Sequence, residues 1–150
     1  MTELSTDDAV ARLLAESEIR NLIGRIAHLS DDGELEPDYI SLFTEDGSWG
    51  SVEGGIRYNG REEILAAAKE RRAQGRQGKG SGLLHFNVSL WISIDGPDDA
   101  HAQSYWAVVK AAEELGGAAT VMGTGRYDDT FRRTPEGWKF LERRVTMKVT

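Results

Sequence analysis

The sequence predicts an α+β protein in which a curved, mixed but mostly antiparallel sheet and about three N-terminal helices enclose one pocket. Two observations lead to this fold class. Helical periodicity is confined to the first half of the chain, and the second half consists of strand-forming segments separated by turn sequences. Helices followed by hairpin-linked strands are typical of α+β folds rather than of parallel α/β folds. Because long antiparallel strands twist and curl, a helix on the concave side leaves a cavity at the open end of the sheet.

The composition is that of one globular domain spanning residues 1–150, with 39% hydrophobic and 29% charged residues. The net charge of −7 argues against a nucleic-acid partner, because phosphate binding requires concentrated Lys and Arg. The absence of cysteine excludes disulfides and thiolate metal sites, and the histidines lack the spacing of helical metal ligands, so we expect no metal. No apolar stretch approaches the ~20 residues of a membrane span, and the N-terminus lacks the features of a signal peptide. We therefore expect a cytoplasmic protein without membrane association.

The first helix is expected to begin at the capping residues 5–8 and to end near Leu29. Its apolar residues recur at three- and four-residue spacing: Val10, Leu13, Leu14, Ile19, Leu22, Ile23 and Ile26. A second helix is expected over residues 37–43, with Pro37 near its start, where the missing N–H costs little. A third is expected over residues 61–73.

A short strand is expected over residues 48–52, and a glycine turn at residues 54–55 precedes residues 56–58. The Gly-rich, basic segment 74–82 is predicted to be a mobile loop, and its role as a lid stays open. Four long segments rich in β-branched and aromatic residues are predicted to form the main sheet: 83–94, 100–111, 118–131 and 137–149.

Asp31 is the first candidate for chemistry. Ile23, Ala27 and Asp31 are spaced by four, so the carboxylate continues the apolar stripe of the first helix toward the core. A carboxylate in that place needs a hydrogen-bond donor, because burial of an unpartnered charge is costly. On spacing alone, a simple cap on the turn before Gly33 is an equally good interpretation.

His85 is the second candidate, near the start of the strand expected over residues 83–94. Alternation places His85, Asn87 and Ser89 on one face of this strand and Phe86, Val88 and Leu90 on the other. Either solvent or a pocket explains such a polar face, and a lone strand histidine is more often structural or surface-exposed than catalytic. Held by a carboxylate, however, it is suited to proton transfer near neutral pH.

Aromatic and flexible side chains are the candidates for the pocket wall, namely Trp49, Tyr58, Trp106 and Met122. Alternation also sends one member of the pair Arg143-Arg144 inward, where it can pair with an acidic group such as Asp129. No phosphate-binding loop, dinucleotide fingerprint or nucleophile-elbow motif is present, so we expect cofactor-independent chemistry.

The pattern as a whole resembles SnoaL-like proteins of the nuclear-transport-factor-2-like superfamily, which have a cystatin-like α+β barrel. The resemblance covers residues 8–148 and rests on these segments: 18–22, 31–33, 43–49, 60–64, 84–87, 104–106, 125–129 and 137–140. It implies an open, cone-shaped barrel around a pocket. The scaffold carries many functions, so the resemblance indicates the fold more strongly than the reaction.

Within this group the pattern is nearest to scytalone dehydratase and hexachlorocyclohexane dehydrochlorinase. Those enzymes pair an aspartate at the end of the first helix with a histidine on the strand after the third helix, and Asp31 and His85 match these positions. The resemblance implies His85 as general base and Asp31 as the residue that orients its ring. The chain departs from the dehydratase pattern, because Ser104 and Trp106 replace a second histidine and Ser30 replaces a tyrosine.

The sequence therefore predicts a lyase or isomerase, dehydratase-like, that acts on a hydrophobic cyclic or aromatic small molecule with Asp31 and His85. Two alternatives remain: a non-catalytic ligand-binding or subunit-assembly protein, and a polyketide-type cyclase that uses Asp31 alone as base. We also expect a homodimer or homotrimer, because the outer face of such a sheet is often apolar.

Overall fold

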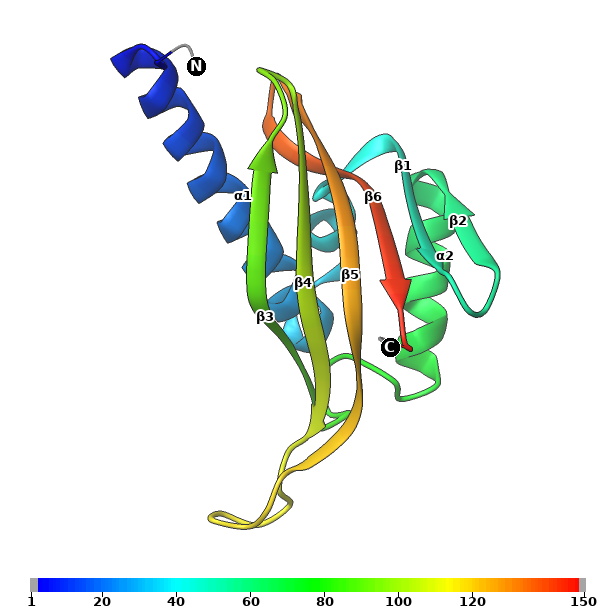
Figure 1. The fold of residues 1–150 in the computed structure, drawn as a ribbon. Helices are drawn as coiled ribbons and strands as arrows, with labels where there is room; N and C mark the ends of the chain where they lie inside the picture. The colour runs from blue at the N-terminus through cyan, green and yellow to red at the C-terminus, as the bar shows by residue number, and fades with distance from the viewer. Residues whose placement is uncertain (1–2, 149–150) are drawn as a thin grey trace.

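The computed structural model describes residues 3–148, which form two α-helices, a short π-helical turn and one sheet of six strands (Figure 1). The elements in chain order are α1 (Thr6–Asp32), η1 (Leu35–Tyr39), β1 (Phe43–Ser51), β2 (Ile56–Asn59), α2 (Gly60–Ala73), β3 (Leu83–Ile94), β4 (Asp99–Lys110), β5 (Thr120–Thr134) and β6 (Gly137–Thr146). The strand order is β2-β1-β6-β5-β4-β3, with β1 and β6 parallel and all other neighbours antiparallel. This mixed, mostly antiparallel sheet confirms the predicted α+β class.

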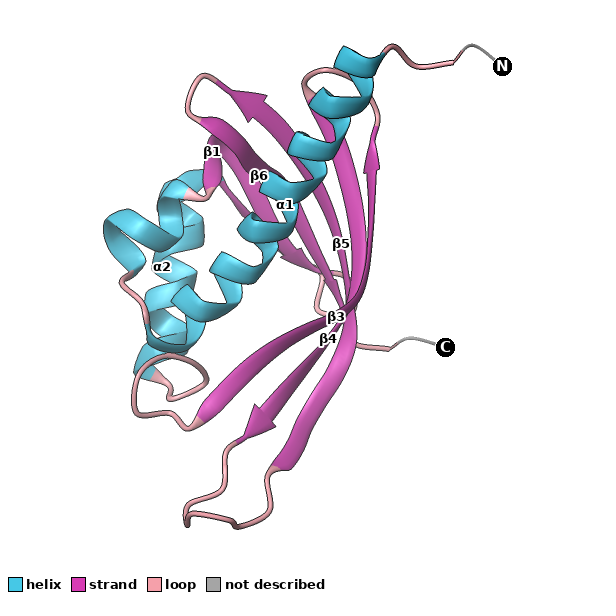
Figure 2. Ribbon diagram, turned by 90° about the vertical axis from the view of Figure 1, so that its left-hand side faces the viewer, coloured by secondary structure: helices cyan, strands magenta, loops and turns pink. Residues whose placement is uncertain are grey.

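The sheet is strongly curved, and both α-helices lie on its concave side (Figure 2). Helix α1 packs against β3 and β6 and buries the isoleucines at positions 19, 23 and 26 almost completely. Each such side chain contributes on the order of 1.5–3 kcal/mol when it is removed from water. The rings of Phe43, Phe131 and Phe140 form the centre of the core. The ring centre of Phe140 lies 5.4 Å from that of Phe43 and 4.9 Å from that of Phe131. The sheet does not close, because its edge strands β2 and β3 do not pair with each other.

The N-terminal end of α1 agrees with the sequence. Ser5 caps the helix by accepting a hydrogen bond from the backbone N–H of Asp8 at 3.1 Å. Val10, Leu13 and Leu14 share the apolar periodicity of this helix but stay exposed, because the first turns project past the sheet (Figure 1).

The segment between α1 and β1 differs from the prediction. The expected helix over residues 37–43 is instead a single π-helical turn, Leu35–Tyr39, in which Glu36 has extended backbone angles. Strand β1 begins at Phe43 rather than at residue 48, because Phe43 pairs with Phe140 of β6 in parallel register. That pairing depends on a strand almost a hundred residues later in the chain, which local periodicity does not reveal.

A bulge in β3 corrects the predicted alternation of that strand. Ser89 has a φ of +52°, and the pairing with β4 shifts between Val88 and Trp91. His85 and Asn87 point inward as expected, but beyond the bulge the phase reverses, so Leu90 packs against the core. The prediction that Leu90 lies on the face opposite His85 was therefore wrong.

The outer face of the sheet presents Phe86 and Val88 to solvent, about half exposed. The expected homodimer or homotrimer that would cover this face stays a prediction. Among the described residues, no helix has the length and apolar character needed to cross a bilayer. Strand β6 ends at Thr146, three residues short of the predicted end, and Val149 lies outside the described residues.

Candidate active site

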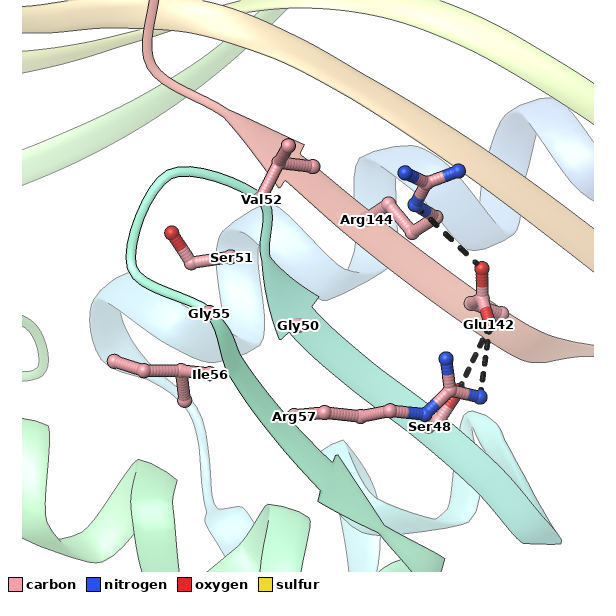
Figure 3. Close-up of a pocket in the computed structure, with 9 residues that line it drawn as sticks. All are labelled: Ser48, Gly50, Ser51, Val52, Gly55, Ile56, Arg57, Glu142 and Arg144. Carbon is pink, nitrogen blue, oxygen red and sulfur yellow. Dashed lines mark hydrogen bonds and ion pairs between the residues drawn. The ribbon is translucent and has the colours of Figure 1, made fainter.

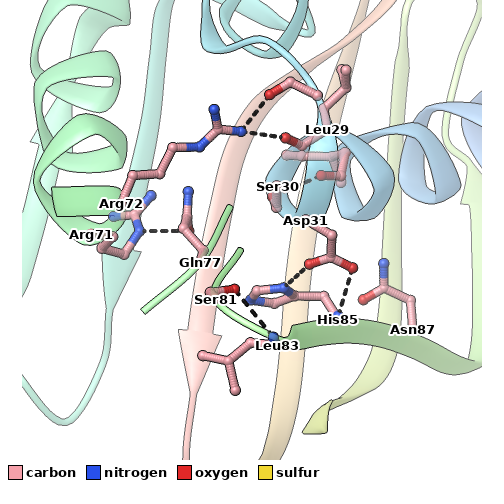
Figure 4. A network of polar contacts seen from close by, with 12 residues as sticks. Leu29, Ser30, Asp31, Arg71, Arg72, Gln77, Ser81, Leu83, His85 and Asn87 are labelled. Atoms are coloured by element: carbon pink, nitrogen blue, oxygen red, sulfur yellow. Dashed lines mark hydrogen bonds and ion pairs between the residues drawn. The ribbon is translucent and has the colours of Figure 1, made fainter. Parts of the chain in front are cut away.

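Asp31 and His85 lie in contact where the end of α1 meets the start of β3 (Figure 4). Oδ1 of Asp31 is 2.5 Å from Nδ1 of His85, and Oδ2 accepts a hydrogen bond from the backbone N–H of the same histidine at 2.9 Å. Both side chains are largely buried, with 13% and 17% of their surface exposed. Because an ionised carboxylate only accepts hydrogen bonds, this contact favours the tautomer with the proton on Nδ1, in which Nε2 has a lone pair.

A residue of the other helix fixes the turn that carries Asp31. The last turn of α1 has no basic residue of its own, but Nη2 of Arg72 from α2 donates to the carbonyl oxygens of Leu29 at 2.8 Å and Gly33 at 2.6 Å. A cation at a helix C-terminus is favourable because the unpaired carbonyls carry partial negative charge. The contact ties the position of Asp31 to α2.

The strand that carries His85 is held to α1 by a second polar contact. Asn87 lies on the same face of β3, and its Nδ2 donates to the carbonyl oxygen of Ile23 at 3.2 Å. His85 pairs with Val108 of β4 in the sheet register, so the adjacent strand also holds its backbone. The imidazole is thus fixed from the helix and from the sheet.

A cavity of about 430 Å³ opens beside His85. Three of the predicted wall residues, Trp49, Trp106 and Met122, line it. Tyr58 does not line it and instead stacks on Trp49, with ring centres 5.8 Å apart. Asp31 is not among the lining residues, so His85 is the member of the pair that faces the cavity.

A glycine of β5, Gly125, leaves room for the Trp106 ring. Gly123 lines the cavity, and a Cβ added to Gly125 would lie 2.6 Å from carbon atoms of the indole. Any larger residue at position 125 would therefore displace Trp106 or the strand. Gly125 thus makes room for a side chain of the cavity wall.

A buried ion pair holds Arg143, which forms another part of the wall. Nε and Nη2 of Arg143 each donate to one carboxylate oxygen of Asp129 at 2.8 Å, and both residues are nearly inaccessible to solvent. This confirms the pairing predicted from strand alternation. Burial alone would lower the pKa of Arg143, but the Asp129 carboxylate raises it above its usual value, so the guanidinium stays charged. The guanidinium carbon of Arg143 lies 3.9 Å from the ring centre of Tyr127. Burial raises the pKa of the Tyr127 phenol above its usual value.

Arg71, Arg76 and Gln77 also line the cavity, and no motif in the sequence predicted them there. Arg71 stands in the last turn of α2, with its guanidinium carbon 4.8 Å from the ring centre of Trp49. Its Nε donates to Oε1 of Gln77 at 3.1 Å, and this contact draws the glutamine inward (Figure 4). Gln77 is only 6% exposed, although it lies in a Gly-rich, basic loop that gives no local signal of burial.

A second, smaller pocket of about 240 Å³ lies between β1, β2 and β6 (Figure 3). Both of its arginines pair with the same carboxylate, since Glu142 lies 3.1 Å from Arg57 and 3.9 Å from Arg144. Neither Asp31 nor His85 contributes to it. The candidate site is therefore the larger cavity beside His85.

Comparison with known proteins identifies the family. Residues 11–144 match the family model described as the SnoaL-like domain. The chain is a member of the SnoaL-like family. A nuclear-transport-factor-2-like protein with a cystatin-like fold from Novosphingobium aromaticivorans is 31% identical to this SnoaL-like protein, with a TM-score of 0.79 over 98% of this chain and 91% of that chain.

More distant structures share the fold of this SnoaL-like protein. Hexachlorocyclohexane dehydrochlorinase from Novosphingobium barchaimii is 18% identical, with a TM-score of 0.74 over 94% of this chain and 91% of that one. A putative scytalone dehydratase from N. aromaticivorans is also 18% identical, with a TM-score of 0.69 over 94% and 89% of the two chains. No curated protein sequence matches this SnoaL-like protein. Within residues 3–148, no three His, Cys, Asp or Glu side chains are grouped to hold a metal ion.

Proposed function

We propose that this SnoaL-like protein is a cofactor-independent lyase or isomerase that acts on a hydrophobic cyclic or aromatic small molecule. His85 is its general base, and Asp31 is the residue that positions the base. The double contact of the Asp31 carboxylate with the ring and the backbone of His85 carries the proposal, because it fixes one tautomer of a histidine that faces a cavity. The names of two structural neighbours, a dehydrochlorinase and a putative dehydratase, denote lyases and agree with this proposal.

The proposed reaction starts with transfer of a proton from a substrate carbon to Nε2 of His85. The electron pair of the broken C–H bond forms a double bond to the adjacent carbon, and the leaving group departs from that carbon with its bonding electrons. A departing hydroxide takes the proton back from the imidazolium and leaves as water, whereas a departing halide leaves the proton to solvent. In an isomerisation the imidazolium returns the proton to another carbon. The ionised Asp31 stabilises the positive ring that forms in between.

A cyclase that uses Asp31 alone as base receives less support from the geometry. Each oxygen of the Asp31 carboxylate already accepts a contact from His85, and Asp31 does not line the cavity. A non-catalytic binding protein would need the cavity but not the fixed tautomer. These alternatives make different predictions for single substitutions.

The test measures turnover of a panel of hydrophobic cyclic compounds, which includes hexachlorocyclohexane, scytalone and ring compounds that carry a carboxylate, by the wild-type protein and by His85→Ala and Asp31→Asn. General base catalysis is worth roughly 10²–10⁴-fold, so His85→Ala should lose that factor in kcat/KM while its circular dichroism stays native. A folded His85→Ala protein that keeps its rate would overturn the assignment. Loss of activity in Asp31→Asn alone would indicate the cyclase. No turnover by the wild type, with unchanged ligand affinity in Asp31→Asn, would indicate a binding protein.

A further inference from the structure

The charge of the cavity is opposite to that of the chain. The protein has a net charge of −7, yet the residues that line the cavity include Arg71, Arg76 and Arg143 and no aspartate or glutamate. Arg143 is neutralised by the buried Asp129 behind it, and Arg76 is exposed at the rim. The charge that remains inside belongs to Arg71.

Arg71 is held in place by uncharged groups. Its Nε donates to Oε1 of Gln77, and its guanidinium lies over the Trp49 ring. Among residues 3–148, no carboxylate lies within ion-pair distance of it. A half-buried guanidinium beside an indole is weakly hydrated, so an anion that enters the cavity gains a charge-assisted hydrogen bond at small cost.

Gln77 supplies an independent observation. Its side chain lines the same cavity and is 6% exposed, and its Nε2 has no hydrogen-bond partner among the described residues. Buried amide donors are almost always partnered, because an unpaired one loses its hydration without compensation. Arg71 occupies the acceptor side of this amide, so the group that Gln77 still needs is a hydrogen-bond acceptor. Arg71 and Gln77 thus both require an acceptor group, and for Arg71 a negatively charged one.

We propose that the cavity binds an organic anion whose carboxylate pairs with Arg71 and accepts from Gln77, while its apolar ring lies against Trp49, Trp106 and Met122. The cavity volume of about 430 Å³ is within the range of small-molecule sites. This anion site names the substrate class for the reaction proposed above and, in that sense, rests on it. The carboxylate then holds the substrate at the Arg71 side of the cavity and presents a ring C–H bond to His85.

The test compares binding of 1-naphthoate with that of its neutral analogue 1-naphthamide by isothermal titration calorimetry. Wild-type protein should bind the carboxylate at least about tenfold more tightly, which corresponds to about 1.4 kcal/mol. Arg71→Met should reduce this ratio to below about threefold. Arg25→Met is the matched control, because it removes the same charge from an exposed position on α1, outside the cavity, and should leave the ratio unchanged.

Gln77→Met provides a second variant that keeps all charges, and it should reduce the ratio by severalfold. Equal affinity for the two probes, no binding of either, or an unchanged ratio in folded Arg71→Met would overturn the anion site. His85→Ala should keep the preference for naphthoate. The two proposals can therefore fail separately. If the wild-type protein shows normal turnover but no preference for naphthoate over naphthamide, the anion site is rejected. If His85→Ala keeps that preference and also keeps normal turnover, His85 is rejected as the base.

Discussion

Substitution of Asp31 by asparagine is the sharpest test of how the candidate base is positioned. In Asp31→Asn the new side chain retains the shape of the carboxylate but has an NH₂ donor in place of one acceptor oxygen. The backbone N–H of His85 is a donor that needs the remaining oxygen, at the place where Oδ2 of Asp31 now accepts at 2.9 Å. The NH₂ group then faces Nδ1 of the ring, so Nδ1 must become the acceptor and the proton must move to Nε2.

The expected loss of activity in Asp31→Asn follows from this exchange of tautomers. With its proton on Nε2, His85 has no lone pair facing the cavity and cannot act as a base. We expect the kcat/KM of Asp31→Asn to fall by roughly 10²–10⁴-fold, the usual worth of a general base, while folding is retained. Ligand affinity should change little, because Asp31 does not line the cavity.

The assay is ¹⁵N nuclear magnetic resonance of the histidine side chains, which distinguishes the two neutral tautomers without any substrate. Wild-type His85 should show a protonated Nδ1, and Asp31→Asn should show a protonated Nε2. The chain supplies a matched control in the exposed pair of His101 and Asp95, whose Nδ1 and Oδ2 are 2.6 Å apart. Asp95→Asn should leave the His85 signals and turnover unchanged. A wild-type ring protonated on Nε2, or an unaltered tautomer in Asp31→Asn, would refute the reasoning.

Two further predictions concern the supports of the site and the C-terminal end of the sheet. Arg72→Met removes two charge-assisted hydrogen bonds to the C-terminal carbonyls of α1, so the free energy of unfolding should fall by about 2–3 kcal/mol in urea titrations. Arg12→Met, which breaks an exposed pair with Glu16, should cost less than about 1 kcal/mol; equal losses would contradict the capping role. Hydrogen bonds from the backbone N–H groups of Lys148 and Met147 hold the pKa of Glu53 below its ordinary value of 4.5. A lowered carboxyl pKa adds stability above pH 4.5 that is lost as pH falls through the folded-state value, so both amide resonances should shift below pH 4.5 in the wild type and not in Glu53→Gln.

The sequence predicted the fold through periodicity and the position of the candidate pair through resemblance. Asp31 follows Ile23 and Ala27 at helical spacing, and β-strand alternation placed His85 and Asn87 on one face of their strand. Alternation also sent one member of the pair Arg143-Arg144 inward toward an acidic group such as Asp129, and the member that pairs with Asp129 is Arg143. In each case a regular repeat determines direction, which is why sequence alone was informative.

Features that break a regular repeat could not be predicted from the sequence. The bulge at Ser89 reverses the phase of β3, and no residue type at that position announces a positive φ. Gln77 is buried because Arg71, six residues earlier and on another element, binds its amide oxygen. Tyr58 was expected in the cavity wall, but the pairing of β1 with β2 places it behind Trp49. Each of these outcomes depends on a partner that the local sequence does not specify.

The bulge at Ser89 also divides β3 into two halves with different roles. Before it, the inward positions His85 and Asn87 are polar and serve the cavity and the tie to α1; after it, Leu90 and Ile92 serve the hydrophobic core. The extra residue uncouples the two halves, so inward positions of the first half can change their chemistry without altering the packing of the second. The side chains that face the cavity at one end of the strand can thus change, while the other end of the strand keeps its packing in the hydrophobic core. Without the bulge, a continuous alternation over the same residues would direct either His85 or Leu90 to the wrong face, because the two positions are five residues apart.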